Sequence, residues 1–182
     1  MLEADPQLAM VLAPRHPERF SAVSTLLYRS GFKWINRLDW VKQPSSAFTP
    51  LRPGEIVLLD TIGELASVYS LASVAFVGGS LIPAGGHNPL EPAQFGVAIV
   101  MGPYYSNFRF IADDLLAHKG VRIAAKDELA ETLIELLRDR TEAEAMGERA
   151  RQVFNQQAGA TGRCVDALRE LLSPESTEER PS

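Results

Sequence analysis

The sequence predicts an α/β fold in which helices cover both faces of a parallel sheet. Short apolar runs alternate with amphipathic stretches along most of the 182 residues. The predicted strands are apolar almost throughout, as in EIVLLD (55–60) and AIVMG (98–102), and do not alternate between apolar and polar residues. Such strands are buried on both faces, and the helices between them permit parallel pairing. Together these features predict a doubly wound, Rossmann-like domain, and the chain is long enough to bury a real core.

Each element can be placed from its apolar pattern and from the residues that end it. The predicted strands are 8–14, 33–38, 55–60, 74–81, 98–102 and 121–125. The predicted helices are 16–31, 63–72, 88–96, 107–120 and a long helical region over 127–172, with a break expected near Gly147 or Gly159. Segment 39–54 holds three prolines and is predicted to be a loop. The domain would therefore cover residues 1–172, followed by a disordered polar tail at 173–182.

Composition excludes several classes of protein. The net charge of −5 argues against a broad nucleic-acid-binding face. No apolar run reaches the roughly 18 residues needed to span a membrane, and the first residues do not form a signal peptide. Three histidines without HxH or HExxH spacing predict no metal site, and the single cysteine, Cys164, excludes an internal disulfide. Nucleotide and hydrolase motifs of the GxGxxG, GxxxxGK[ST] and GxSxG types are also absent.

Polar and glycine-rich segments follow four of the predicted strands. They are PRH (14–16), DTIGE (60–64), GGHNPLE (85–91) and MGP (101–103). Ligands of doubly wound sheets bind beyond the carboxyl ends of the strands. These four segments are therefore the predicted place for a binding site.

The segment GGHNPLE permits two interpretations. Asn88 at an N-cap, Pro89 at the first helical position and Glu91 at the third would form a capping box, worth about 1 kcal/mol without any ligand. That interpretation leaves Gly85, Gly86 and His87 unexplained. Glycines allow positive φ and close approach of a ligand to the backbone, and a helix N-terminus attracts anions. The residues alone leave both interpretations open.

Two further segments carry the same ambiguity. Thr61 and Glu64 could form a second capping box, yet Gly63 would weaken a first helical turn and could instead admit a flat ring or a ribose. Arg15 directly follows the first strand, where its guanidinium is suited to a phosphate or a carboxylate. An exposed ion pair between Arg15 and Glu18 is the alternative.

Taken together, the motifs resemble one family. PRHPERF (14–20), DTIGEL (60–65), FVGGSL (76–81), GGHNPLEP (85–92) and MGP (101–103) occur in the order and at the spacing found in the C-terminal domain of 3-deoxy-D-manno-octulosonic acid (Kdo) transferases. The resemblance runs over about residues 8–172. It implies the C-terminal half of a two-domain GT-B glycosyltransferase of lipopolysaccharide biosynthesis, which moves Kdo from cytidine monophosphate–Kdo (CMP-Kdo) to a lipid A precursor.

The resemblance also implies a donor site and its residues. The positions that match the family's nucleotide-contacting motifs are Pro14, Arg15, Ile62, Gly63, Glu64, Asn88, Pro89, Leu90 and Glu91. Arg15 would offset the phosphate or Kdo carboxylate charge, and Glu91 would reach the ribose hydroxyls. Neither a metal nor a cofactor is implied besides the donor substrate CMP-Kdo.

The same resemblance places other functions outside this chain. The family's catalytic glutamate, its lipid A precursor site and its membrane anchor belong to an N-terminal domain, so no catalytic residue is expected here. The chain starts roughly where the C-terminal domain would start, which predicts a soluble fragment, inactive alone, of an enzyme at the cytoplasmic face of the inner membrane. No nucleic-acid partner is expected.

Two rival functions remain open at this point. The first is another GT-B glycosyltransferase or an epimerase that uses a uridine diphosphate sugar. The second is a non-catalytic, flavodoxin-like domain with Asp60 as a phosphate acceptor, although such a domain has no use for GGHNPLE.

Overall fold

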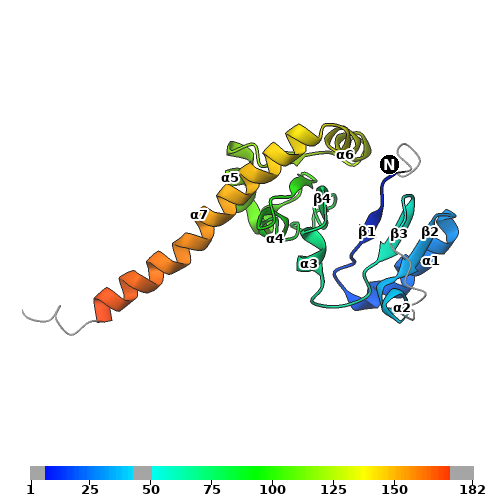
Figure 1. The fold of residues 1–182 in the computed structure, drawn as a ribbon. Coiled ribbons are helices and arrows are strands. Elements are labelled where there is room, and N and C mark those ends of the chain that lie inside the picture. Colours follow the sequence, from blue (N-terminus) through cyan, green and yellow to red (C-terminus); the bar gives the residue numbers. More distant parts are fainter. Residues whose placement is uncertain (1–6, 43–50, 173–182) are drawn as a thin grey trace, which may run out of the picture.

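The computed structural model describes residues 7–42 and 51–172 and has an α/β fold (Figure 1). Its strands in these residues are β1 (Met10–Leu12), β2 (Lys33–Asn36), β3 (Glu55–Leu58), β4 (Val74–Val77), β5 (Ala98–Met101) and β6 (Val121–Ile123). Each lies inside a strand predicted from the sequence, and each is shorter than predicted. The predicted tail at 173–182 lies outside the described residues.

The helices also follow the predicted order, with one addition. They are α1 (Phe20–Ser30), α2 (Arg37–Val41), α3 (Leu65–Tyr69), α4 (Leu90–Ala93), α5 (Arg109–Ala117), α6 (Leu129–Arg138) and α7 (Arg140–Leu172). Short 3-10 helices stand at Pro17–Arg19 (η1) and Ser106–Phe108 (η3), before α1 and α5.

Helix α2 corrects the prediction of a strand to residue 38 and a loop from residue 39. The Asp60 carboxylate at the end of β3 accepts a hydrogen bond from the Leu38 N–H at 3.0 Å. This satisfies one of the unpaired N–H groups at the start of the helix. A partner 22 residues away cannot be read from local sequence. The Asp60 carboxylate therefore has a structural role, because it caps a helix. The alternative in which Asp60 accepts a phosphate does not require this role.

The strands pair only in parallel, as predicted, but they form two three-stranded sheets. The orders are β1-β3-β2 and β4-β5-β6. Within the first sheet Met10 pairs with Ile56, and within the second Val74 pairs with Ala98. The predicted fold class, a doubly wound α/β domain with parallel strands, is confirmed, and its strands are divided between two sheets because no ladder joins β1 to β4 in the described residues. Helix α3 carries the chain from one sheet to the other (Figure 1).

The second sheet is covered on both faces, as a doubly wound fold requires. Ile99 and Met101 of β5 lie in a buried cluster with residues of α4, α5 and α7. Ala98 and Val100 face the opposite way, into a cluster with residues of α6 and the first turns of α7. All four side chains are at most 1% exposed. The alternation of Cβ atoms along a strand produces these two faces, and burial on both explains why the strand has no polar residue.

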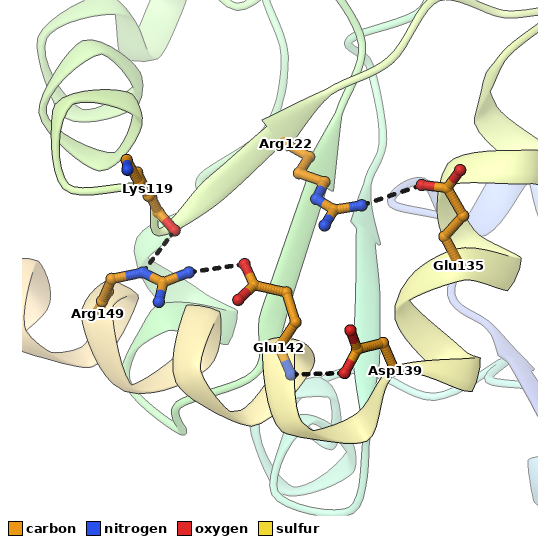
Figure 2. A network of polar contacts seen from close by, with 6 residues as sticks. All are labelled: Lys119, Arg122, Glu135, Asp139, Glu142 and Arg149. Carbon is orange, nitrogen blue, oxygen red and sulfur yellow. Dashed lines mark hydrogen bonds and ion pairs between the residues drawn. The ribbon is translucent and has the colours of Figure 1, made fainter.

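The helical region 127–172 breaks at Asp139, between α6 and α7. The Asp139 carboxylate accepts the N–H of Glu142 at 3.0 Å and so caps α7, as Figure 2 shows. Arg149 then ties α7 to the turn before β6, donating to the Lys119 carbonyl and to Glu142, both at 2.9 Å. The predicted break near Gly147 or Gly159 is wrong. Gly147 lies within α7, and a Cβ there would overlap the backbone of Gly96, so the glycine permits close packing of α7.

Candidate functional site

The segment after β1 contacts the segment after β4. Arg15 donates from Nη1 to Nδ1 of His87, and the two nitrogens are 3.1 Å apart. Glu18 lies near His16 instead, at 3.8 Å from its Nδ1, so the alternative ion pair between Arg15 and Glu18 is not formed. Pro14 is half-buried, and Arg15 is exposed. The contact joins carboxyl-terminal ends of strands from both sheets, where a ligand of an α/β fold is expected.

His87 is held by the glycine pair that follows β4. Its backbone N–H donates to the Gly78 carbonyl, and the Gly86 N–H donates to the Gly79 carbonyl, both at 3.0 Å. A Cβ on Gly79 would lie 3.0 Å from Cε1 of the His87 ring, and Gly79 has a positive φ of 71°. The absence of a Cβ at Gly79 therefore leaves the space that the imidazole occupies. Because arginine can only donate, Nδ1 of His87 is the acceptor and the ring proton lies on Nε2.

Gly85 and Gly86 both adopt the positive φ that the sequence predicted, at 85° and 76°. Both are buried. A Cβ on Gly85 would overlap the side chain of Asn107, and one on Gly86 would lie 3.2 Å from the Tyr104 carbonyl oxygen. The close approach that these glycines permit is therefore to the chain's own loop after β5.

The NPLE segment forms a shorter helix than predicted. Helix α4 is a single turn, from Leu90 to Ala93, instead of 88–96. The Asn88 side-chain oxygen accepts the Leu90 N–H at 3.1 Å, which is the capping contact expected of it. Pro89 is buried. Glu91 is exposed and makes no hydrogen bond within residues 7–42 and 51–172, so the predicted capping box is not closed by Glu91.

The TIGE segment is organised by an arginine that sequence reasoning did not select. Arg37 of α2 donates from Nη2 to Glu64 Oε1 at 2.9 Å, and the Thr61 hydroxyl donates to the other carboxylate oxygen. These two hydrogen bonds, that from Thr61 first, lower the pKa of Glu64. Gly63 has a φ of 91° and precedes α3, so the prediction that it sits in a helical first turn is wrong. Ile62 is 84% exposed.

Electrostatics link the segments further. Burial, then the charge of Arg15 and that of His16, lower the pKa of His87, while Glu91 opposes this shift. Burial, then the charge of Glu91, raise the pKa of Tyr69 at the end of α3 to about 12. Glu91 therefore lies close enough to act on both His87 and α3, which packs against α4.

We expect the pKa of His87 in the folded chain to lie below its ordinary value of 6.5. The neutral ring accepts from Arg15, and a protonated ring would face a second cation. The unfolded chain then binds the proton more tightly, so the contribution of His87 to stability is complete above pH 6.5 and falls as the pH drops toward the folded pKa. An NMR titration of the ring measures this pKa. Arg15→Gln should raise it, and a parent value at or above 6.5 would contradict the contact.

The described residues contain neither a metal-binding cluster nor a helix suited to a membrane. Within residues 7–42 and 51–172, no three His, Cys, Asp or Glu side chains are grouped so as to hold a metal ion. In the same residues, none of the helices combines the length and the apolar character that crossing a membrane requires.

The sequence therefore identified most of the segments but not their partners. The structure brings Arg15 to the GGHNPLE segment and places Glu91 near α3. It shows no hydrogen bond between 62–64 and 88–91 among the described residues. Sequence reasoning left His87 out of the site, although the residue stands inside the most informative motif, and it missed Arg37 and Tyr69. Neither of the latter two carries a local signal.

Curated relatives and a solved structure indicate the family of this chain. No family model matches the chain. It is 35% identical to a 3-deoxy-D-manno-octulosonic acid transferase of Haemophilus influenzae over 94% of the chain and 39% of the relative. The transferase of Bordetella pertussis is 33% identical over 93% of the chain and 38% of the relative. The chain thus spans about two fifths of the length of these curated relatives.

A solved structure covers the same region. It is the crystal structure of the C-terminal CMP-Kdo binding domain of WaaA from Acinetobacter baumannii, with a TM-score of 0.72 and 34% identity. The match covers 84% of this chain and 76% of that one. The predicted resemblance is confirmed by these relatives. The chain belongs to the 3-deoxy-D-manno-octulosonic acid transferase family, in the region that corresponds to the C-terminal domain of the A. baumannii protein.

Proposed function

We propose that this chain is the donor-binding part of a Kdo transferase and binds CMP-Kdo. The observation that carries the proposal is the contact between Arg15 and His87 at 3.1 Å. It assembles two motif segments, 72 residues apart, at the carboxyl ends of the strands. The solved domain of A. baumannii is a CMP-Kdo binding domain, which supports the same ligand.

The nucleotide contacts are proposed for the residues that match the family motifs. They are Pro14, Arg15, Ile62, Gly63, Glu64, Asn88, Pro89, Leu90 and Glu91. Arg15 uses one guanidinium nitrogen on His87, which leaves further donors for the phosphate. As the bond to Kdo breaks, negative charge grows on the departing cytidine monophosphate, and a fixed arginine stabilises it.

Two carboxylates have different proposed roles. Glu91 is exposed and has no hydrogen-bond partner in the described part of the chain, so both of its oxygens can accept from ribose hydroxyls. Glu64 already accepts from Thr61 and Arg37. We therefore propose that Glu64, besides its nucleotide contact, positions the turn of Ile62 and Gly63, whose exposed surface borders the nucleoside.

The remaining functions are proposed for the full-length enzyme. Transfer of Kdo to a lipid A precursor, at the cytoplasmic face of the inner membrane, needs a general base, and that base is proposed to lie in the N-terminal domain. The donor is proposed to be the only small molecule required, with neither a metal nor a cofactor.

A comparison of two nucleotides tests the proposal against a uridine-nucleotide enzyme. Calorimetric titration of the chain should show weak binding of cytidine monophosphate and at least tenfold weaker binding of uridine monophosphate, about 1.4 kcal/mol. Equal affinities would favour the uridine-sugar alternative. No heat with either nucleotide at millimolar concentration, from a chain that melts cooperatively, would refute the donor site.

A further inference from the structure

A hollow of about 230 Å³ lies between the loops that follow β4 and β5. The β4 loop contributes Pro83 and Gly85 to its wall, and the β5 loop contributes most of the rest. We call it the 83–109 pocket. Its lining includes Pro83, Gly85, Tyr104, Tyr105, Ser106 and Arg109. None of the proposed nucleotide contacts belongs to this set.

The two walls of the 83–109 pocket are tied together. The fully buried Ser80 accepts the Gly102 N–H on its hydroxyl at 2.8 Å and the Tyr104 N–H on its carbonyl at 2.9 Å. At the other end of the loops, the Asn107 N–H donates to the Gly85 carbonyl at 3.0 Å. Hydrogen bonds at both ends hold the hollow open without a ligand. A preformed site spends less free energy on ordering when it binds.

The lining chemistry indicates the class of ligand. Arg109 is the one cation among the lining residues, and it forms no ion pair within residues 7–42 and 51–172. Its planar guanidinium suits a carboxylate or a phosphate. Ser106, Tyr104 and Tyr105 bring hydroxyl groups, which bond to the hydroxyls of a sugar. An arginine beside three hydroxyl-bearing side chains matches an acidic sugar.

The size of the pocket and its position fit one part of the donor. Sites for whole drug-sized ligands measure about 300–1,000 Å³, so 230 Å³ suits a fragment such as one sugar ring. The pocket wall at Gly85 is two residues from His87, whose ring contacts Arg15. In CMP-Kdo one phosphate joins the ribose to the sugar acid, so the sugar must lie next to the phosphate. The 83–109 pocket adjoins the His87 segment through Gly85 and lies outside the proposed nucleotide contacts, so it meets this requirement.

We infer that the 83–109 pocket holds the sugar acid of the donor and that Arg109 pairs with its carboxylate. The inference rests on the proposed function and assigns a second subsite to it. Arg15 then serves the phosphate and Arg109 the carboxylate, so the two negative groups of the donor have separate partners.

The test compares Arg109→Gln with a matched variant. Arg29→Gln removes an equally exposed arginine from the last turn of α1, on the other sheet. Each protein is titrated with CMP-Kdo and, separately, with cytidine monophosphate. Arg109→Gln should weaken CMP-Kdo binding about tenfold and leave cytidine monophosphate binding unchanged, while Arg29→Gln changes neither. Arg109→Lys keeps the charge but loses the paired donors, and its loss should be intermediate.

The outcomes separate the inference from the proposed function. If Arg109→Gln weakens both ligands equally, the pocket serves the phosphate and the inference is overturned. If Arg109→Gln leaves the affinity for both ligands unchanged, the inference is overturned as well, while the nucleotide site stays intact. If the parent binds neither ligand, the proposed function fails first and the inference with it. Thermal melts accompany every titration, and Arg109→Lys decides the matter if Arg109→Gln does not fold.

Discussion

Replacing Gly102 with alanine should lower the free energy of unfolding by about 3 kcal/mol, the upper part of the range for overpacking. Gly102 is buried directly after β5. A Cβ there would lie 2.8 Å from the Leu81 backbone nitrogen and nearer still to backbone atoms of Ser80. These are main-chain atoms, and Ser80 is fully buried, so neither side can move cheaply. The loops after β4 and β5 would separate.

Gly78→Ala is the matched control. Gly78 also stands directly after a strand, but an added Cβ would meet Cδ2 of His87 at 3.5 Å, an ordinary contact. We expect a change within about 1 kcal/mol, because the smaller entropy of the unfolded chain offsets any crowding. Denaturant-unfolding curves of both variants measure the difference. Equal stability of the two would contradict the close approach of the loops.

The sequence predicted the order and class of the elements because both depend on local patterns. Apolar runs marked every strand, and Gly31 ends α1 with a φ of 75°, as predicted. The errors concern contacts between distant residues. Helix α2 depends on Asp60, and Gly147 packs within a helix against the backbone of Gly96, 51 positions earlier in the sequence. Whether six strands form one sheet or two depends on packing between elements, which the sequence of a single strand does not specify.

In the candidate site, too, the local patterns could be predicted from the sequence and the contacts between distant residues could not. The motif segments were visible in the sequence because glycines and capping residues differ plainly from the apolar strands that they follow. Their partners were not, since Arg15 had a plausible local partner in Glu18 and instead contacts His87. The role proposed for Glu64 from the structure differs from the one expected from the sequence for the same reason. Arg37 of α2 donates a hydrogen bond to its carboxylate.

Glu91→Gln should weaken binding of cytidine monophosphate by tenfold or more while leaving the melting temperature nearly unchanged. A carboxylate makes stronger hydrogen bonds to ribose hydroxyls than an amide does, about 1.5–3 kcal/mol against about 1. The Glu91 side chain is exposed and makes no hydrogen bond in the residues that the structure describes, so the fold loses little. Asn88→Ala should differ, because it removes the acceptor of the Leu90 N–H and costs about 1 kcal/mol of stability as well.

Glu131→Gln controls for the loss of one charge. Glu131 is also an exposed acid in the first turn of a helix, α6. It lies away from the motif segments in the sequence, so its replacement should change neither nucleotide affinity nor the melting temperature. If Glu131→Gln weakened nucleotide binding by the same factor, the loss of net charge alone would explain the effect of Glu91→Gln.

We propose above all that GGHNPLE belongs to a nucleotide site and is not merely a capped turn. Calorimetric titration of cytidine monophosphate into Glu91→Gln, beside the parent, tests it most directly. We expect a dissociation constant at least tenfold higher in the variant, with thermal melts that coincide. If the variant binds the nucleotide as tightly as the parent does, Glu91 has no part in binding, and the assignment of GGHNPLE to the ribose and phosphate is contradicted.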